Sequence, residues 1–311
     1  MLLFLTNCSQ NNQKRHWKEL PVAFEDRAKI EVGGPYAGTE FHDSQMVPQR
    51  ISFFYPVANS LDNSRDYWTR DTSFIGDWYL KIGDNPKIWL NNLQCEIELT
   101  PYSVVFFHEN KDYAINSSYR FCKNKPALVL TVEIENSQDE TKEYQFETGL
   151  RNYLRSSHSY RVYKHSRSTI NNGDIFIYYE FPGLDSAQVF VANVGARPDY
   201  INNNGTILSE DEKSRNHVSQ CIYKKRLKPG ESMNIIQIIG SAKPKESEST
   251  VNYLKKNYNR EINQYNRSIL QKIRPGILRT GYDHIDHSLA YAYSVIEANA
   301  HYLDGEIVPM P

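Results

Sequence analysis

The sequence lacks the features that mark membrane-spanning, nucleic-acid-binding or repeat proteins. No stretch approaches the roughly 20 consecutive apolar residues that a spanning helix needs. The 36 Lys and Arg are balanced by 37 Asp and Glu, so there is no basic field to hold nucleic acid and no acidic tail. No repeat of fixed period is visible, which argues against solenoids and propellers. At 311 residues, one large domain plus a smaller part is the natural expectation.

Signatures of several enzyme classes are also missing. There is no G-x-S-x-G elbow, so acyl-transfer chemistry has no support. The glycine-rich run at residues 33–38 lacks the spacing of a phosphate loop and precedes no strand–helix–strand unit, so we interpret it as a loop. Cys95, Cys122 and Cys221 have neither paired nor metal-type spacing and are expected to be buried apolar residues. We expect no cofactor.

Asp283-His284-Ile285-Asp286-His287 places two imidazoles and two carboxylates within about one helical turn. The run does not reproduce the His pair and supporting Glu of a zinc helix. Acidic residues at a helix start are already explained by capping and by the helix dipole. We therefore predict no metal site.

Aromatic residues are abundant, with 22 Tyr, 13 Phe and 4 Trp, and Tyr suits both half-buried strands and stacking against sugar rings. Alternating apolar and polar residues predict a mainly β fold, a large antiparallel β-supersandwich over residues 21–241. The runs with this period are Lys87–Leu99, Tyr102–His108, Ala127–Asn136, Glu143–Leu154, Asp174–Phe181, Ala187–Val194, Val218–Leu227 and Ser232–Gly240. Residues 30–71 are rich in Gly, Pro and aromatics and predict irregular structure with short strands.

Two details sharpen this prediction. In the run 127–136 one face is apolar throughout, while the other changes from Ala127 and Val129 to Thr131, Glu133 and Glu135, as in a strand that leaves its cover at one end. Residues 228–231, Lys-Pro-Gly-Glu, predict a tight turn in which Gly supplies a positive φ.

Helical periodicity begins only after the polar segment 241–249. Residues 246–275 predict a long linker helix with one apolar stripe, ending at Arg274-Pro275-Gly276. The stripe consists of Val251, Leu254, Tyr258, Ile262, Tyr265, Ile269 and Ile273. A second amphipathic helix is predicted in residues 282–311, with Asp283 as its N-cap and Gly305 at its end. Ile285, Leu289, Ala292, Ile296 and Leu303 would share one face of it.

Residues 1–20 have the character of a signal or lipoprotein leader. A short apolar run, Met1 to Leu5, precedes Cys8, which would be lipidated if the leader is a bacterial lipoprotein signal. That reading predicts a protein of the bacterial cell envelope, held to the membrane only by the lipid anchor. If the leader is not a signal, a cytoplasmic location follows.

The densest cluster with a functional character is Tyr67-Trp68-Thr69-Arg70-Asp71. An aromatic ring can stack on the apolar face of a sugar while an adjacent Arg and Asp bond its hydroxyls. Tyr67, Trp68, Arg70 and Asp71 are therefore predicted to bind a carbohydrate ligand; the alternative is a partly buried Trp beside a structural ion pair.

Several segments resemble the front part of bacterial glycoside hydrolases that combine a β-supersandwich with an (α/α)6 toroid, of the glycogen-debranching or amylo-alpha-1,6-glucosidase type. They are Phe41–Ser44, Pro48–Ser60, Asp66–Asp71, Leu99–Val104, Tyr119–Ala127 and Asp286–Tyr293. The resemblance implies that the helix after residue 282 is the first of a truncated toroid. It also implies that the acid and base of hydrolysis lie beyond Pro311. The chain alone would then be inactive, and the stretch from Tyr282 onward poorly buried.

No catalytic residue is predicted within the chain. Glycoside hydrolysis needs two carboxylates brought together from separate segments, which spacing along a sequence cannot show. Glu297, Asp304 and Glu306 are more simply solvated acids. The leading hypothesis is the N-terminal portion of a hydrolase acting on α-glucan or a related glycan. The alternatives are a non-catalytic sugar-binding surface lipoprotein and a mutarotase-like epimerase, for which His108, His158 and His165 are unpositioned candidates.

Overall fold

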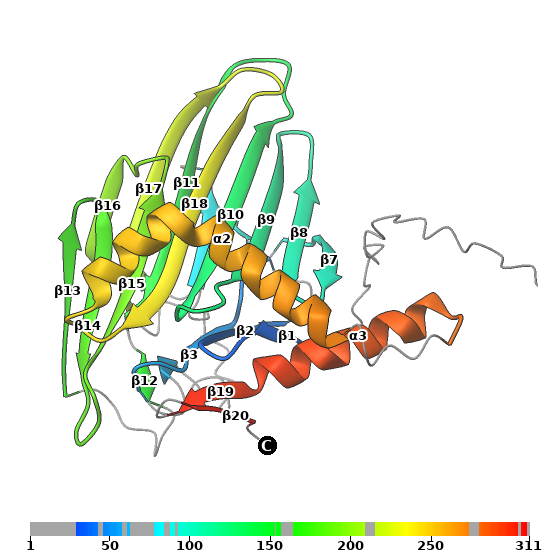
Figure 1. Ribbon diagram of the computed structural model, residues 1–311. Coiled ribbons are helices and arrows are strands. Elements are labelled where there is room, and N and C mark those ends of the chain that lie inside the picture. Colours follow the sequence, from blue (N-terminus) through cyan, green and yellow to red (C-terminus); the bar gives the residue numbers. More distant parts are fainter. Residues whose placement is uncertain are drawn as a thin grey trace, which may run out of the picture.

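Strands dominate the computed structural model, and two helices follow them near the C-terminus (Figure 1). The structure describes residues 29–42, 46–57, 61–62, 78–83, 88–90, 93–152, 154–156, 164–208, 215–273, 280–303 and 306–309. All strand pairs among these residues are antiparallel. The predicted fold class, mainly antiparallel β followed by a long helix and a shorter one, is confirmed.

The strands form three larger sheets and one hairpin. The eight-stranded sheet contains, in spatial order, β13 (His165–Asn171), β14 (Asp174–Glu180), β15 (Ala187–Val194), β18 (Ser232–Ala242), β10 (Ala127–Asn136), β9 (Tyr113–Phe121), β8 (Ser103–Glu109) and β7 (Glu96–Thr100). The β17 sheet contains β16 (Tyr200–Leu208), β17 (Arg215–Leu227), β11 (Lys142–Arg151), β5 (Trp78–Ile82) and β6 (Ile88–Trp89).

The N-terminal sheet contains β1 (Lys29–Gly33), β2 (Ala37–His42), β3 (Arg50–Phe53), β4 (Leu61–Asp62) and β12 (Arg155–Ser156). The C-terminal hairpin consists of β19 (Ala300–Leu303) and β20 (Glu306–Pro309). In Figure 1 the N-terminal sheet lies below the long helix and next to the C-terminal hairpin.

Several strands were missed by the sequence prediction, and the positions or compositions of β13, β16 and β9 explain why they were among them. Strands β13 and β16 are edge strands, and nearly every side chain of β13 is exposed, so neither needs an apolar face. Strand β9 carries Ser117 and Ser118 in its centre, which interrupts the apolar pattern. The predicted single run 87–99 is divided in two, because β6 and β7 belong to different sheets.

Strand β10 shows how the two faces of the eight-stranded sheet are used. Leu128, Leu130, Val132 and Ile134 are fully buried in the main core. On the opposite face Ala127 and Val129 are buried in a second cluster with residues of the long helix, whereas Glu135 is exposed. The predicted loss of cover along this strand is therefore confirmed, and the cover is the helix.

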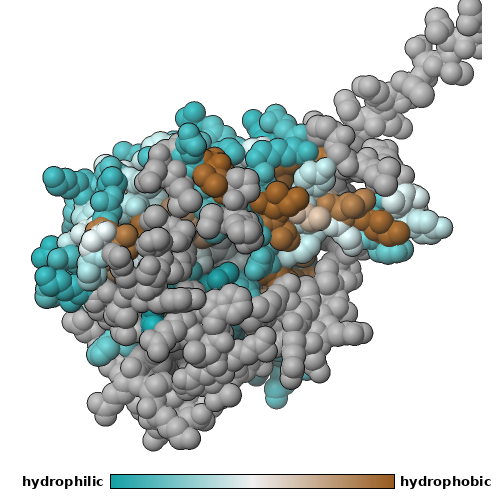
Figure 2. Space-filling model, turned by 90° about the horizontal axis from the view of Figure 1, so that it is seen from below, coloured by the Kyte–Doolittle hydropathy of each residue, from teal (hydrophilic) through white to brown (hydrophobic). Residues whose placement is uncertain are grey.

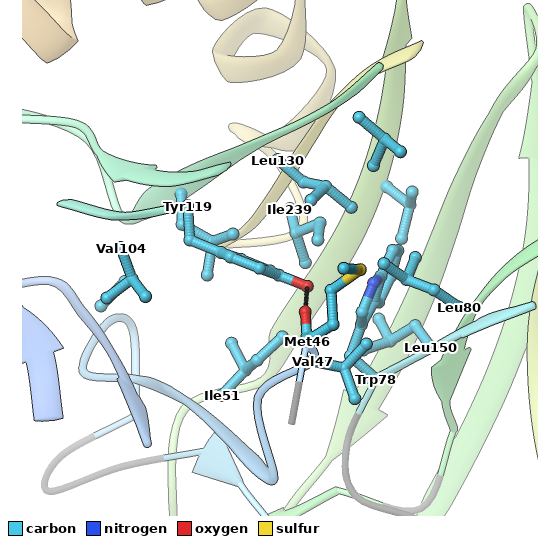
Figure 3. Packing of buried hydrophobic residues seen from close by; sticks show 14 of the residues in the cluster. Met46, Val47, Ile51, Trp78, Leu80, Val104, Tyr119, Leu130, Leu150 and Ile239 are labelled. Atoms are coloured by element: carbon cyan, nitrogen blue, oxygen red, sulfur yellow. Dashed lines mark hydrogen bonds between the residues drawn. The ribbon is translucent and has the colours of Figure 1, made fainter. Parts of the chain in front are cut away.

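The main core fills the space between the sheets and is dominated by large aliphatic and aromatic side chains (Figure 3). Tyr119 reaches from β9 and donates a hydrogen bond to the carbonyl of Met46 at 3.1 Å. From the β17 sheet, the same core contains the side chains of Trp78, Leu80 and Leu150. The predicted turn at residues 228–231 is confirmed, with φ of 70° at Gly230 and a 2.9 Å bond from the Glu231 amide to the Lys228 carbonyl. It joins β17 to β18, which lie in different sheets.

The predicted long helix is confirmed as α2 (Ser247–Ile273), and six of its seven predicted stripe residues are buried while Tyr258 is half-buried. Glu261 also lies on the buried face, where its carboxylate accepts bonds from the Asn124 amide at 2.8 Å and the Tyr253 hydroxyl at 2.7 Å. Tyr265 donates a hydrogen bond to the Gly33 carbonyl, and a Cβ on Gly34 would lie 2.9 Å from its ring. The glycine-rich run is thus the β1–β2 turn on which α2 docks.

The second helix, α3 (Asp283–Ala298), differs from its prediction at both ends. Tyr282 is the N-cap, without a side-chain capping bond, so the predicted Asp283 cap is wrong. Asp286 instead accepts bonds from the amide and hydroxyl of Thr280 at 2.9 and 2.8 Å. The helix ends at Ala298 rather than near Gly305, because the C-terminal hairpin follows; the Asp-Gly dipeptide between its strands is a turn signal. Within the described segments neither helix has the length and apolar character to cross a membrane.

Candidate functional site

The N-terminal sheet carries a cluster of charged side chains on the face opposite the core. Ile51 and Phe53 of β3 point into the core. Because successive side chains of a strand alternate between its faces, Arg50 and Ser52 point to the other face. Glu40 on β2 pairs with Arg50 across the strands, and Asp62 on β4 pairs with Arg155 on β12. The polar face therefore follows directly from strand alternation and register.

The cluster is held by short polar contacts and is largely removed from solvent. Arg50 Nη2 lies 3.2 Å from Glu40 Oε2, and the Ser52 hydroxyl donates to Asp62 Oδ2 at 2.9 Å. Glu40 and Asp62 are each 1% exposed and Arg155 is 4% exposed. Burying charges costs free energy unless they are paired and hydrogen-bonded. Two carboxylates and two guanidinium groups on one sheet face thus balance one another.

The C-terminal hairpin brings an imidazole to this face. The His301 ring stacks on the Phe54 ring with centroids 3.6 Å apart and an angle of 15° between the planes. Burial lowers the pKa of His301 to about 4, and the nearby Arg50 charge acts in the same direction. His301 is therefore neutral near pH 7 and can exchange hydrogen bonds without adding charge. We define the polar-face cluster as Glu40, Arg50, Ser52, Asp62, Arg155 and His301.

The His301 imidazole should make stability depend on pH. Between pH 6.5 and 4 the unfolded chain takes up a proton on this residue that the folded chain does not, so the free energy of unfolding should fall as the pH falls through that window. The His301→Gln variant should lose this part of the dependence. Urea unfolding of both proteins at pH 7.5 and 4.5 measures it. His165→Gln, which changes an exposed imidazole, serves as the control. If the free energy of unfolding changes by the same amount between pH 7.5 and 4.5 in wild type and in His301→Gln, the assignment to His301 is wrong.

The predicted sugar-binding residues Tyr67, Trp68, Arg70 and Asp71 lie outside the described residues, as does Cys8. Their segment, 63–77, joins β4 to β5. It therefore starts directly after Asp62 of the polar-face cluster and is followed by Trp78, which pairs with Leu150 near the end of β11. No member of the polar-face cluster was predicted as a site residue from the sequence; the only signal was the alternation around Arg50, in a region predicted to be irregular with short strands.

The other sequence candidates do not form a site in the described segments. Glu297 forms an ion pair with Lys272 at 2.6 Å and joins α3 to α2, while Glu306 is exposed and Asp304 lies outside these segments. His108 and His165 lie on β8 and β13, near opposite edges of the eight-stranded sheet, and His158 is not described. No group of three or more His, Cys, Asp or Glu side chains suited to a metal ion occurs among the described residues.

Two of the three cysteines are buried as predicted, and the third is not fully buried. Cys122 and Cys221 are buried and Cys95 is half-buried, and all three are free thiols. Burial raises the pKa of Cys95 and of Cys221 to about 12, and that of Cys122 further. Because the thiolate is the nucleophile, these side chains are poorly suited to covalent catalysis.

Comparison with known proteins identifies relatives of the fold only. No family model and no curated protein matches the sequence. Among solved structures, the chain is similar to a protein assigned as a kojibiose phosphorylase from human microbiome, with a TM-score of 0.60 and 11% identity over 86% of this chain and 39% of that one. A bacterial glucoamylase complexed with acarbose gives a TM-score of 0.55 and 10% identity over 90% of this chain and 44% of that one.

A galactose mutarotase-like protein from Lactobacillus casei gives a TM-score of 0.45 and 8% identity over 69% of this chain and 100% of that one, a likeness too weak to support an argument. The chain thus shares its fold with part of the phosphorylase and glucoamylase chains and spans less than half the length of either.

Proposed function

We propose that this chain is the front portion of a glycoside hydrolase acting on α-glucan or a related glycan. Residues 21–241 would be its β-supersandwich domain, residues 246–275 its linker helix, and residues 282–311 the start of an (α/α)6 catalytic domain. The catalytic carboxylates would then lie in further helices past Pro311. The likeness to the phosphorylase and glucoamylase folds supports the order of the parts, although it carries no substrate assignment.

The observation that carries the proposal is the outer face of α3. Ala290 and Tyr291 face the body of the molecule, where the Tyr291 hydroxyl accepts from the Glu31 amide at 2.9 Å and donates to the Glu31 carbonyl at 3.1 Å. On the opposite face Ile285 and Ile296 are 38% and 61% exposed, and Ala292 between them is exposed too. A helix that is apolar on both faces is typical of one enclosed by other helices.

The surface view agrees with this description. Figure 2 shows apolar surface running in a row along the side of the molecule on which α3 lies. Apolar patches aligned along one exposed face of a helix are typical of a surface that contacts a partner. A second helix of the proposed catalytic domain would cover it.

We propose further that the segment containing Tyr67, Trp68, Arg70 and Asp71 reaches the sugar from the β domain, beside the polar-face cluster. An aromatic ring next to an Arg and an Asp provides one stacking surface and two hydrogen-bonding groups, and Asp62 and Arg155 flank the start of the segment.

Kinetics of the longer polypeptide test this proposal. The protein extended past Pro311 along its coding sequence should hydrolyse maltoheptaose, and the 311-residue chain should not. Trp68→Ala should raise KM about tenfold, because loss of a stacked ring typically costs about 1 to 1.5 kcal/mol of binding. The matched control is Phe107→Ala, which removes a 38% exposed ring from β8. Turnover by the 311-residue chain, or an extension without amphipathic helices, would contradict the proposal; binding without turnover in the longer protein would favour a sugar-binding role.

A further inference from the structure

The outer face of the β17 sheet carries one continuous row of side chains across all five strands. The register pairs Tyr200 with Ile222, Ile222 with Glu147, Glu147 with Lys81, and Lys81 with Trp89. Directly paired residues of neighbouring strands lie on the same face. Phe146, Leu80 and Cys221, each next in sequence to a residue of this row, lie in the main core. Because successive side chains of a strand alternate between its faces, the row points away from the core.

A hydrogen-bonded network joins Glu147, at the centre of the row, to Tyr79, Gln220 and Asn202 of the neighbouring row on the same face. The Tyr79 hydroxyl donates to Glu147 Oε1 at 2.7 Å, and the Gln220 amide donates to the Tyr79 hydroxyl at 2.9 Å and to Glu147 Oε1 at 3.1 Å. Asn202 extends the network by donating to Gln220 Oε1 at 3.3 Å. Glu147 is 2% exposed and Tyr79 is 1% exposed, whereas Gln220 and Asn202 are half-buried. Glu147 and Tyr79 therefore form the buried base of the network, and Gln220 and Asn202 are partly exposed to solvent.

Aromatic rings stand at both ends of the row. Trp89 is half-buried, and the Lys81 ammonium lies 3.8 Å from the centroid of its ring. Tyr200, on the opposite edge strand, is 57% exposed. Four strand spacings of about 4.8 Å separate the two edge strands, so the rings stand about 19 Å apart.

Among the described residues, both helices pack chiefly on strands of other sheets. Helix α2 packs on β15, β18 and β9 of the eight-stranded sheet, and the β17 sheet lies behind that sheet in Figure 1. A buried carboxylate on a sheet face costs free energy that an apolar residue there would not. A hydrogen-bonded set of amide and carboxylate groups on the same sheet face as two aromatic rings is typical of a carbohydrate-binding surface.

We propose that this row binds a neutral oligosaccharide, at a surface separate from the polar-face cluster. Lys81 and Glu147 carry opposite charges, so the row has no net charge with which to select an anionic or cationic ligand. The half-buried amides of Gln220 and Asn202, held in place by the network on the buried Glu147, would bond hydroxyl groups of the ligand, and Tyr200 supplies the exposed stacking ring. The surface would hold a glycan chain rather than act on it.

Binding of maltoheptaose and of cellohexaose to the 311-residue chain, measured by calorimetry, tests this inference. Tyr200→Ala should weaken binding of the preferred oligosaccharide by roughly two- to tenfold, the range expected for one stacked ring. Tyr200→Phe keeps the ring and should bind within about twofold of wild type. Because Tyr200 is largely exposed, neither change should unfold the chain. Phe107→Ala again controls for loss of an exposed ring.

The outcomes separate this inference from the proposed function. Loss of affinity in Tyr200→Ala but not in Trp68→Ala supports the binding row. Loss in Trp68→Ala but not in Tyr200→Ala overturns it and leaves the proposed function standing. Failure of the wild-type chain to bind either oligosaccharide also overturns it, without bearing on turnover by the longer protein.

Discussion

Replacing Gly149 by alanine should lower the free energy of unfolding by about 3 kcal/mol, the sum of overpacking and of buried hydrogen bonds lost. A Cβ at this position would lie 2.0 Å from Cε1 and 2.2 Å from Cζ of Tyr79. The Tyr79 ring is 1% exposed and cannot move aside without breaking its 2.7 Å bond to Glu147. Urea unfolding followed by fluorescence measures the loss.

Two further variants show whether the ring causes the effect. Gly38→Ala adds the same methyl group to β2, where the nearest atom would be Phe54 Cζ at an ordinary 3.4 Å, and should cost under about 1 kcal/mol. Tyr79→Ala should make the Gly149→Ala change nearly neutral, so the two substitutions should be strongly non-additive. Additive losses would mean that the Tyr79 ring does not lie over Gly149.

Introducing charge on the outer face of α3 should affect the short and long polypeptides very differently. In the 311-residue chain Ile296→Glu should change the free energy of unfolding by no more than about 0.5 kcal/mol, because the side chain is 61% exposed. In the protein extended past Pro311 the same change should cost about 3 kcal/mol or more, because a carboxylate would be buried against a neighbouring helix. Chemical unfolding of both pairs measures the difference.

The matched control is Ile170→Glu on edge strand β13, where the isoleucine is 44% exposed. It should be tolerated equally in the short and long proteins. If Ile296→Glu is also tolerated in the long protein, no helix covers α3 there, and the proposed domain arrangement is wrong.

Patterns of local origin were predictable. The alternation in β10 and β15 gave both strands with the correct ends, and the spacing of Val251, Leu254 and Ile262 gave the buried face of α2. Such patterns suffice because each buried face must be apolar at the period of its own element. The end of α3 was predicted wrongly, because apolar residues continue into the C-terminal hairpin and the helical period continues with them.

The candidate site was predictable only in part. Arg50 lies within Pro48–Ser60, one of the segments that carry the family resemblance, but the positions of Glu40, Asp62 and His301 depend on strand register and on a hairpin some 250 residues away. Likewise, Glu147, Lys81 and Trp89 come from three separate strands, and nothing in their local sequence relates them.

The sequence by itself determined the succession of β domain, long helix and second helix, because hydrophobic periodicity is a local property that each element must satisfy to bury one face. Only the tertiary structure decided which polar residues share a face, because cross-strand register and the docking of distant segments arise from the packing of the whole chain. That packing placed Arg50, Asp62 and His301 on one face, and Glu147 between two aromatic rings on another.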